Sequence, residues 1–273
     1  MKYYNDFEYT LSKKICESLN INICKITSNY CLTILKPECL LTNKVQQTLN
    51  IYREYGYQPV YIKVKKLCEE QVLSLWKYGW GNATLSRIVM NYITMCWNYC
   101  AIIILKSANS LTDACEHLNS FKGPSVSTAN NPTTNLIRSR LHSLNNFLNF
   151  VHISDCANDL LRELPILFAH NELIELGNII NQDLTLNEKE VQTILQPYIS
   201  HYKIEDPDKL FRKYVNSVSQ NNVYMTKQLA VALKSAYENK TISIDLLFEL
   251  IDKKALYWSW ETIVIFSQYI DYT

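Results

Sequence analysis

Glycine is scarce in this chain, with five glycines among 273 residues, whereas an average protein has about 7%. Sandwiches and barrels need a tight turn about every 8 to 12 residues, usually built with glycine, proline, asparagine or aspartate. Doubly wound α/β folds need glycine at their phosphate-binding turns. Helices joined by polar loops need neither frequent tight turns nor glycine-rich phosphate-binding turns. The shortage therefore predicts an all-α chain, a multi-helix bundle or irregular α-solenoid in two lobes, with at most a short β element near 57–64.

Apolar residues recur at helical spacing over much of the chain, beginning with Phe7, Leu11, Ile15 and Leu19. The same pattern predicts further helices over the segments 42–55, 66–78, 135–151, 154–169, 171–181, 187–203, 207–219, 222–238, 243–253 and 257–271. No period of a known repeat family accompanies them.

Two of these helices have recognisable start signals. Asp206 precedes Pro207, which is an N-cap followed by proline at the first helical position. Asn187 and Glu190 have the spacing of a capping box. Both signals predict where a helix begins.

Two segments differ from this pattern. After a proline, residues 57–64 alternate Val60, Ile62 and Val64, which predicts a short strand or an extended linker. Residues 88–105 carry no charge, so a membrane span has to be considered. Because polar residues interrupt this stretch, we expect a central core helix and no membrane association.

The clearest break in the chain is the segment 122–134, which contains a glycine, two prolines and many small polar residues. It predicts a flexible linker or surface loop between an N-terminal helical lobe, residues 1–121, and a C-terminal helical lobe, residues 135–273. A single lobe with a long surface loop fits the same pattern.

Charge and composition bear on location and origin. The 27 basic and 26 acidic residues give a net charge of +1, so no global field favours nucleic acid or lipid. The first residues lack the features of a signal peptide, which predicts a cytoplasmic protein with reduced thiols. The abundance of asparagine, isoleucine, lysine and tyrosine suggests an AT-rich genome, as in a virus or intracellular parasite, whose protein would act in the host cytosol.

Motifs for catalysis are missing from the sequence. The one G-x-G, Gly79-Trp80-Gly81, has Thr84 where a dinucleotide fingerprint needs its third glycine, and no phosphate-binding P-loop occurs. The histidines are scattered singly, and we expect those at 142, 152 and 170 to be surface or core residues. No catalytic residue and no cofactor is predicted.

A metal site is considered because Cys96 and Cys100 would share one face of a helix, with Cys115 and His117 following shortly after. Their spacing matches no zinc finger or knuckle. Cysteines in so apolar a segment are usually core residues, so these four stay weak candidates and no metal is predicted.

Basic residues form three clusters beside tyrosines, which would suit single-stranded RNA held in a basic cleft between the lobes. The candidates are Lys63, Lys65, Lys66, Arg138, Arg140, Lys203, Lys209, Arg212 and Lys213. The near-zero net charge favours the simpler interpretation of solvated surfaces.

Aromatic residues crowd the C-terminal segment, where Tyr257, Trp258, Trp260, Phe266 and Tyr269 are candidates for a protein interface. We therefore predict a non-enzymatic scaffold or assembly subunit that acts through a protein partner or self-association. One alternative is a nucleoprotein-like protein that binds single-stranded RNA. A second is an enzyme whose catalytic residues are dispersed along the sequence and meet only in the fold.

Overall fold

A four-stranded antiparallel sheet lies at the centre of the computed structural model, so the all-α prediction is wrong. The structure describes residues 3, 5–125, 135–221, 226–256 and 258–272. The strands are β1 (Tyr30–Leu35), β2 (Tyr57–Lys65), β3 (Cys100–Ser107) and β4 (Val151–Ile153), in the order β2-β3-β1-β4. The strand predicted near 57–64 is confirmed as β2.

The central strands escaped prediction because they are buried on both faces. Every residue of β1 is buried, and so is nearly all of β3, so neither strand alternates apolar with polar residues. Short apolar runs of this kind cannot be told from buried helix by periodicity alone. The single core helix predicted over 88–105 is wrong, because this stretch is most of α6 (Leu85–Cys96) and, after a break in the helix, most of β3. Within the described residues, no helix is both long and apolar enough to cross a membrane.

The helices before β4 are short. They are α1 (Phe7–Ser18), α2 (Ile23–Asn29), α3 (Pro37–Leu41), α4 (Val45–Glu54), α5 (Glu69–Leu75), the 3-10 turn η1 (Trp80–Asn82), α6, α7 (Ala114–Ser120) and α8 (Ile137–Leu141). The long helix predicted over 135–151 is wrong, because α8 ends at Leu141 and β4 begins ten residues later at Val151.

The helices after β4 follow the predicted segments, except that the helix predicted over 187–203 ends at Leu195 and is followed by a 3-10 turn. They are α9 (Ala157–Leu167), α10 (His170–Gln182), α11 (Glu188–Leu195), the turn η2 (Gln196–Tyr198), α12 (Pro207–Asn221), α13 (Lys227–Asn239), α14 (Ile244–Asp252) and α15 (Trp260–Tyr269). Both predicted start signals are confirmed. Asn187 Oδ1 accepts a hydrogen bond from Glu190 N at 3.0 Å, and Asp206 Oδ1 accepts one from Lys209 N at 3.0 Å.

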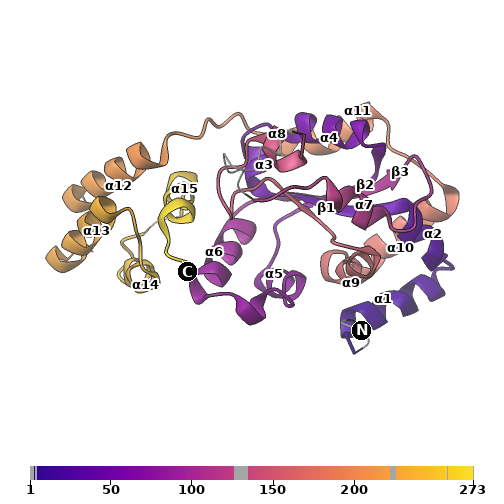
Figure 1. Ribbon diagram of the computed structural model, residues 1–273, viewed down its shortest axis with the longest axis horizontal. Helices are drawn as coiled ribbons and strands as arrows, with labels where there is room; N and C mark the ends of the chain where they lie inside the picture. The colour runs from indigo at the N-terminus through magenta and orange to yellow at the C-terminus, as the bar shows by residue number, and fades with distance from the viewer. Residues whose placement is uncertain (1–2, 4, 126–134, 222–225, 257, 273) are drawn as a thin grey trace.

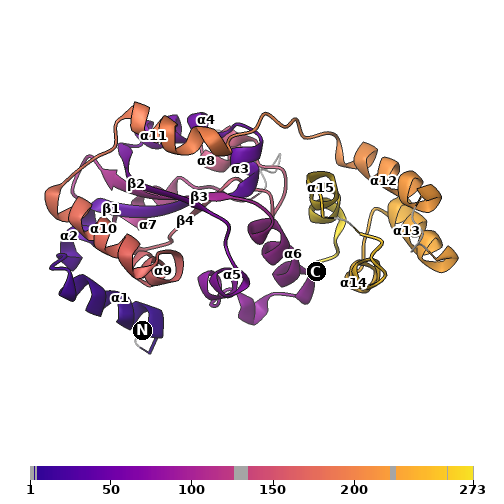
Figure 2. The same ribbon diagram turned by 180° about the vertical axis from the view of Figure 1, so that it is seen from behind.

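Helices cover both faces of the sheet. In Figures 1 and 2, α4 and α11 lie on one side, and α9, with α1 outside it, lies on the other. The order β1-α4-β2-β3-α7-β4 with antiparallel neighbours is a ferredoxin-like arrangement, to which the α5–α6 hairpin has been added between β2 and β3. The larger hydrophobic core fills the space between sheet and helices.

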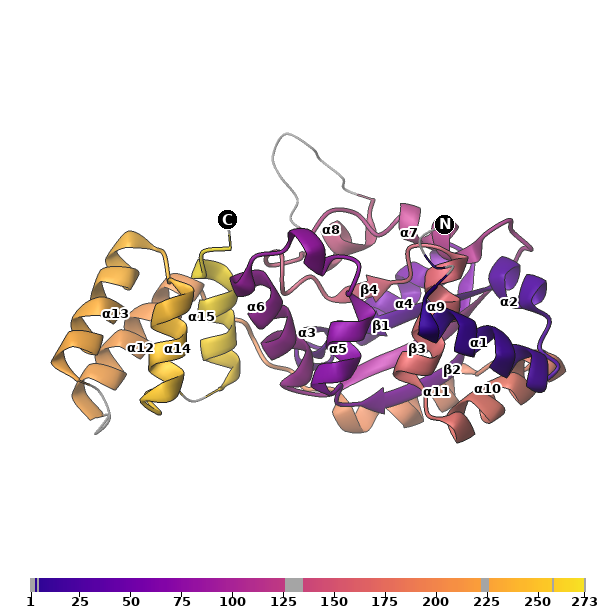
Figure 3. The same cartoon turned by 90° about the horizontal axis from the view of Figure 1, so that it is seen from below.

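A second hydrophobic core joins the last four helices to the sheet domain. Helices α12 to α15 form a bundle, and α15 packs beside α6 (Figure 3). This core takes in Met90 and Ile93 of α6 and Phe147 and Leu148 before β4. The predicted division of the chain at 122–134 stays a prediction, since residues 126–134 lie outside the described residues. The larger core nevertheless draws residues from both sides of that segment.

Candidate functional site

Lys36 is a buried cation at the end of a central strand. It follows β1 directly, and Pro37 then begins α3. Its ammonium donates hydrogen bonds to the Phe147 carbonyl and to Asn149 Oδ1, the latter at 3.2 Å, and lies 3.7 Å from Glu38 Oε1. Burial lowers the pKa of Lys36, because removing the ammonium from water disfavours its charged form.

The neighbouring backbone is strained. Phe150 has a φ of 67°, a region that bulky side chains rarely adopt. Two hydrogen bonds hold it there: Phe150 N donates to Glu38 Oε1 at 2.9 Å, and Lys36 N donates to the Phe150 carbonyl at 2.9 Å. The buried Lys36 and Glu38 thus fix the start of β4. Strain of this kind is concentrated at functional sites.

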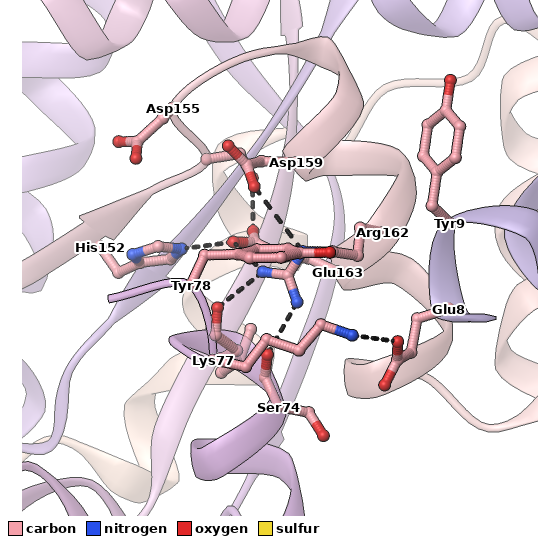
Figure 4. A network of polar contacts seen from close by, with 12 residues as sticks. Glu8, Tyr9, Ser74, Lys77, Tyr78, His152, Asp155, Asp159, Arg162 and Glu163 are labelled. Atoms are coloured by element: carbon pink, nitrogen blue, oxygen red, sulfur yellow. Dashed lines mark hydrogen bonds and ion pairs between the residues drawn. The ribbon is translucent and has the colours of Figure 1, made fainter. Parts of the chain in front are cut away.

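His152 is presented by β4 beside these residues. Val151 and Ile153 are buried on one face of the strand, so the side chain between them points to the opposite face. Glu163 Oε1 lies 3.0 Å from His152 Nε2, and Ser154 Oγ donates to Glu163 Oε2 at 2.6 Å. A carboxylate only accepts, so Nε2 carries a proton, and in the neutral imidazole the free electron pair is then on Nδ1. Figure 4 shows the second ring nitrogen of His152 pointing away from Glu163.

A buried arginine connects the helix that carries Glu163 to the α5 region. Arg162 Nη1 donates to the Ser74 carbonyl at 2.7 Å (Figure 4). Arg162 Nη2 donates to the Leu75 carbonyl at 2.6 Å. Trp76 follows at once, and its ring meets the His152 ring edge to face at 5.4 Å between centroids. Two adjacent residues of α9 therefore orient the imidazole. Glu163 contacts it directly, and Arg162 holds the segment that carries Trp76.

Arg138 supplies a second, partly buried cation. Its Nη2 donates to the Val151 carbonyl at 2.9 Å, and its Nη1 to the Gly123 carbonyl at 3.3 Å and Ser125 Oγ at 3.4 Å. Burial lowers the pKa of Arg138 to about 10, which leaves it charged at neutral pH. Its buried Nε has no hydrogen-bond partner among the described residues, and Glu38 and Asp155 attract the guanidinium electrostatically. A partly buried guanidinium with an unpaired N–H favours an anionic ligand.

These groups line one cavity of about 450 Å³. Three cations reach it, Lys36, Arg87 and Arg138, along with His152. None of its described lining residues is an aspartate or glutamate. The other lining residues are mainly amides and aromatic rings: Trp76, Trp80, Asn91, Asn146, Phe147, Asn149 and Tyr272. The cavity therefore suits a ligand that has both anionic and flat apolar parts.

The chemistry of the cavity is that of a nucleophile among cations. A neutral imidazole with one nitrogen fixed by a carboxylate can attack an electrophile through the other nitrogen. Lys36 and Arg138 are placed to stabilise negative charge on a phosphoryl group. The arrangement is therefore suited to moving a phosphoryl group onto and off His152.

Most predicted RNA-binding residues lie outside this cavity. Lys63 and Lys65 pair with Glu172, each at 3.0 Å, and Arg140 pairs with Glu54. The remaining residues are Lys66, which lies over the Tyr99 ring, Lys209 and Lys213, which pair with Glu205, and the exposed Lys203 and Arg212. Of the nine candidates, the fold brings only Arg138 to the site.

The four metal candidates fall on three elements. Cys96 ends α6, Cys100 begins β3, and Cys115 and His117 lie in α7. The helical face predicted for Cys96 and Cys100 is wrong, because α6 ends at Cys96 and β3 begins at Cys100. Across the part of the chain that the structure describes, no three side chains of metal-ligating type lie close enough to hold an ion.

The predicted interface residues divide into two groups. Trp260 and Phe266 are buried within the chain's own second core. Trp258 and Tyr269 are partly exposed, so the interface stays a prediction that rests on these two. Tyr257 lies outside the described residues.

Sequence reasoning missed His152, Lys36, Asn149 and Glu163. The available signal was weak: a Lys-Pro pair directly after an apolar run, and a histidine followed two residues later by serine. Neither pattern can be recognised as part of a site from the sequence alone, because Lys36 and His152 are more than a hundred residues apart in the chain.

Comparison with known proteins supplies a family. The family model described as nucleoside diphosphate kinase matches residues 29–173, which include all four strands, Lys36, His152 and Glu163. Comparison with curated proteins finds no match.

Solved structures of the same description are similar to this chain. A nucleoside diphosphate kinase from Aquifex aeolicus is 18% identical, with a TM-score of 0.43, over 51% of this chain and 94% of that one. An NDP kinase from Pyrobaculum aerophilum is 16% identical, with a TM-score of 0.38, over 53% of this chain and 98% of that one.

The family match overturns the prediction of a non-enzymatic protein. The predicted non-enzymatic scaffold is wrong, and so is its alternative, an RNA-binding protein. The description of the chain as an all-α, viral, RNA-binding protein that is not an enzyme is wrong as well. The physical reason is that the predictions rested on the absence of local motifs, whereas this site is assembled from distant segments.

Proposed function

Because this chain belongs to the nucleoside diphosphate kinase family, we propose that it transfers the terminal phosphoryl group of a nucleoside triphosphate to a nucleoside diphosphate by way of His152. The observation that carries this proposal is the position of His152, whose Nε2 is bound to Glu163 and whose ring lines a cavity with the buried Lys36 and the partly buried Arg138. Self-association is compatible with this family, and it remains a prediction.

The reaction has two balanced halves. In the first, His152 Nδ1 attacks the γ-phosphorus, the N–P bond forms, and the P–O bond to the β-phosphate breaks, so that a nucleoside diphosphate leaves. In the second, the β-phosphate oxygen of another nucleoside diphosphate attacks the phosphorus, and the imidazole leaves with its electron pair restored. Lys36 and Arg138 stabilise charge on the phosphate oxygens in both halves.

Three groups prepare His152 for this role. Glu163 fixes the tautomer and stabilises the positive charge that develops on the imidazole during attack. Trp76 limits rotation of the ring by edge-to-face contact. The Thr33 hydroxyl donates to the His152 carbonyl at 2.7 Å and holds the strand. The nucleophile is therefore pre-oriented, which is the main contribution that a protein makes to phosphoryl transfer.

The direct test is phosphorylation by γ-labelled ATP with Mg²⁺, followed by addition of unlabelled GDP. We expect an acid-labile label on the wild-type protein, and its transfer to GTP when GDP is added. His152→Gln should reduce both signals to background. His170→Gln is the matched control, since His170 is exposed on α10, and it should behave as the wild type. Label retained by His152→Gln, or a wild type that neither takes up nor transfers label, would overturn the proposal.

A further inference from the structure

The C-terminal end of the described chain returns to the cavity that contains His152. Tyr272 lines this cavity, although it lies far beyond residues 29–173, which the family model matches. Thr84 Oγ1 donates to the Tyr272 carbonyl at 3.0 Å, and Asn146 Nδ2 donates to Tyr272 Oη at 2.8 Å. The ring meets that of Phe147 edge to face at 5.6 Å. The residue is therefore fixed at its backbone, its ring edge and its hydroxyl.

Its anchors belong to the two segments that carry other cavity residues. Thr84 is the N-cap of α6, the helix that brings Arg87 and Asn91 to the cavity. Asn146 belongs to the loop that brings Asn149 beside Lys36. Tyr272 thus connects two walls of the cavity.

The C-terminal bundle holds this tail in place. Ile242 and Ile270 form a parallel bridge, in which Ile242 N donates to the Tyr269 carbonyl at 2.8 Å and Asp271 N donates to the Ile242 carbonyl at 2.9 Å. Asn145 Nδ2 donates to Ser267 Oγ of α15 at 3.1 Å, and this contact is buried. The bundle therefore fixes the tail and the loop before β4 together.

The ring of Tyr272 is available to a ligand even though its edges are fixed. The residue keeps 37% of its surface exposed while lining the cavity. A ring that is already oriented loses little conformational entropy when a flat ligand packs on it. The cavity volume of about 450 Å³ is in the range of small-molecule sites.

We propose that Tyr272 is a nucleoside-contacting residue, and that the base of the bound nucleotide stacks on its ring while the phosphates lie among Lys36, Arg138 and His152. This inference rests on the proposed function, because it takes the ligand to be a nucleotide. It adds that the helices beyond the family domain complete the substrate site. Phosphate recognition and base recognition then come from different parts of the chain.

The test compares two ligands that differ in the nucleoside. The affinities of the full chain for ADP and for inorganic tripolyphosphate are measured by calorimetry. Tyr272→Ala should weaken ADP binding by about tenfold, the effect of losing one stacked base, and leave tripolyphosphate affinity unchanged. Tyr272→Phe keeps the ring and should retain ADP affinity. Tyr198→Ala, which removes another partly exposed tyrosine outside the cavity, is the matched control and should change neither affinity.

Three other outcomes would contradict the inference, and each has a different meaning. If Tyr272→Ala weakens both ligands equally, Tyr272 only supports the cavity wall. If ADP affinity is unchanged while the wild type forms phosphohistidine, the base lies elsewhere and only this inference fails. If the wild type binds neither ligand, the proposed function fails as well. In the kinetic version of the test, Tyr272→Ala should raise KM and leave kcat unchanged.

Discussion

At the scale of single residues, the site depends on side chains whose partners are already fixed. Lys36 is bound by two oxygens before any ligand arrives, and Arg138 is bound by two backbone carbonyls. Their charges are therefore oriented without a further entropy cost when phosphate binds. His152 is fixed in the same way by Glu163 and Trp76.

Replacing Glu163 tests this fixation. Glu163→Ala removes the acceptor for His152 Nε2 and for Ser154 Oγ, so the imidazole loses its fixed tautomer and orientation. We expect kcat for phosphoryl transfer to GDP to fall by about a hundredfold. In Glu163→Gln the side chain can still accept a hydrogen bond, so kcat should fall less. ADP affinity, measured by calorimetry, should be unchanged in both variants, and a kcat equal to that of the wild type would refute the positioning role.

At the scale of elements, ion pairs tie helices to the sheet. Glu172 lies in the first turn of α10 and pairs with Lys63 and Lys65 of β2. Burial alone would raise the pKa of Glu172. The hydrogen bonds from the Ala169 backbone N–H and from the two lysines outweigh burial and lower the pKa to about 2. Lysines that the sequence offered as RNA-binding residues therefore hold α10 against the sheet.

This ion pair predicts a pH-dependent stability difference. The pKa of Glu172 is lower in the folded chain than its ordinary 4.5, so its stabilisation is complete above pH 4.5 and is lost as pH falls towards about 2. Glu172→Gln should lower the free energy of unfolding by about 1–3 kcal/mol at pH 7 and by much less at pH 3. Urea unfolding at both pH values measures this.

The control lies on the same helix. Glu175 is exposed and accepts one hydrogen bond, from Tyr61 Oη at 2.9 Å. Glu175→Gln should therefore cost little stability at either pH. An equal loss for Glu172→Gln at pH 7 and pH 3 would show that its charge contributes nothing.

At the scale of the whole molecule, the bundle and the sheet domain share a core through α6. Trp260 is buried at the start of α15. Its ring stacks on that of Trp97, the residue that follows α6, with 5.8 Å between the ring centroids and 26° between the ring planes. Tyr202, in the segment that leads to α12, meets the same ring edge to face at 6.1 Å. The aromatic residues predicted as a partner interface thus include one that connects two parts of the same chain.

Truncating this side chain should destabilise the molecule and loosen the substrate site. Trp260→Ala should lower the free energy of unfolding by about 3–5 kcal/mol, the usual cost of removing a buried tryptophan. ADP affinity should fall too, because α6 carries Arg87 and Asn91. Trp258→Ala, at a partly exposed ring, is the control and should cost less. Equal losses for the two variants in urea unfolding would argue against a shared core.

The sequence by itself determined the local features of this protein. Helices after residue 154 follow from apolar spacing, and the caps at Asn187 and Asp206 form because donors and acceptors lie three residues apart. The strand at 57–65 was predictable because its residues alternate. Such features depend on neighbours in the chain, so a single sequence contains them.

Only the tertiary structure decided the sheet and the site. Strands β1 and β3 are buried on both faces, and their apolar runs become strands only when paired, as Leu32 is with Ile104. His152 looks like any other histidine until Glu163, Lys36 and Arg138 surround it. The physical reason is that hydrogen bonds between strands, and the electrostatics of a buried cavity, depend on residues that are far apart in sequence and adjacent only after folding.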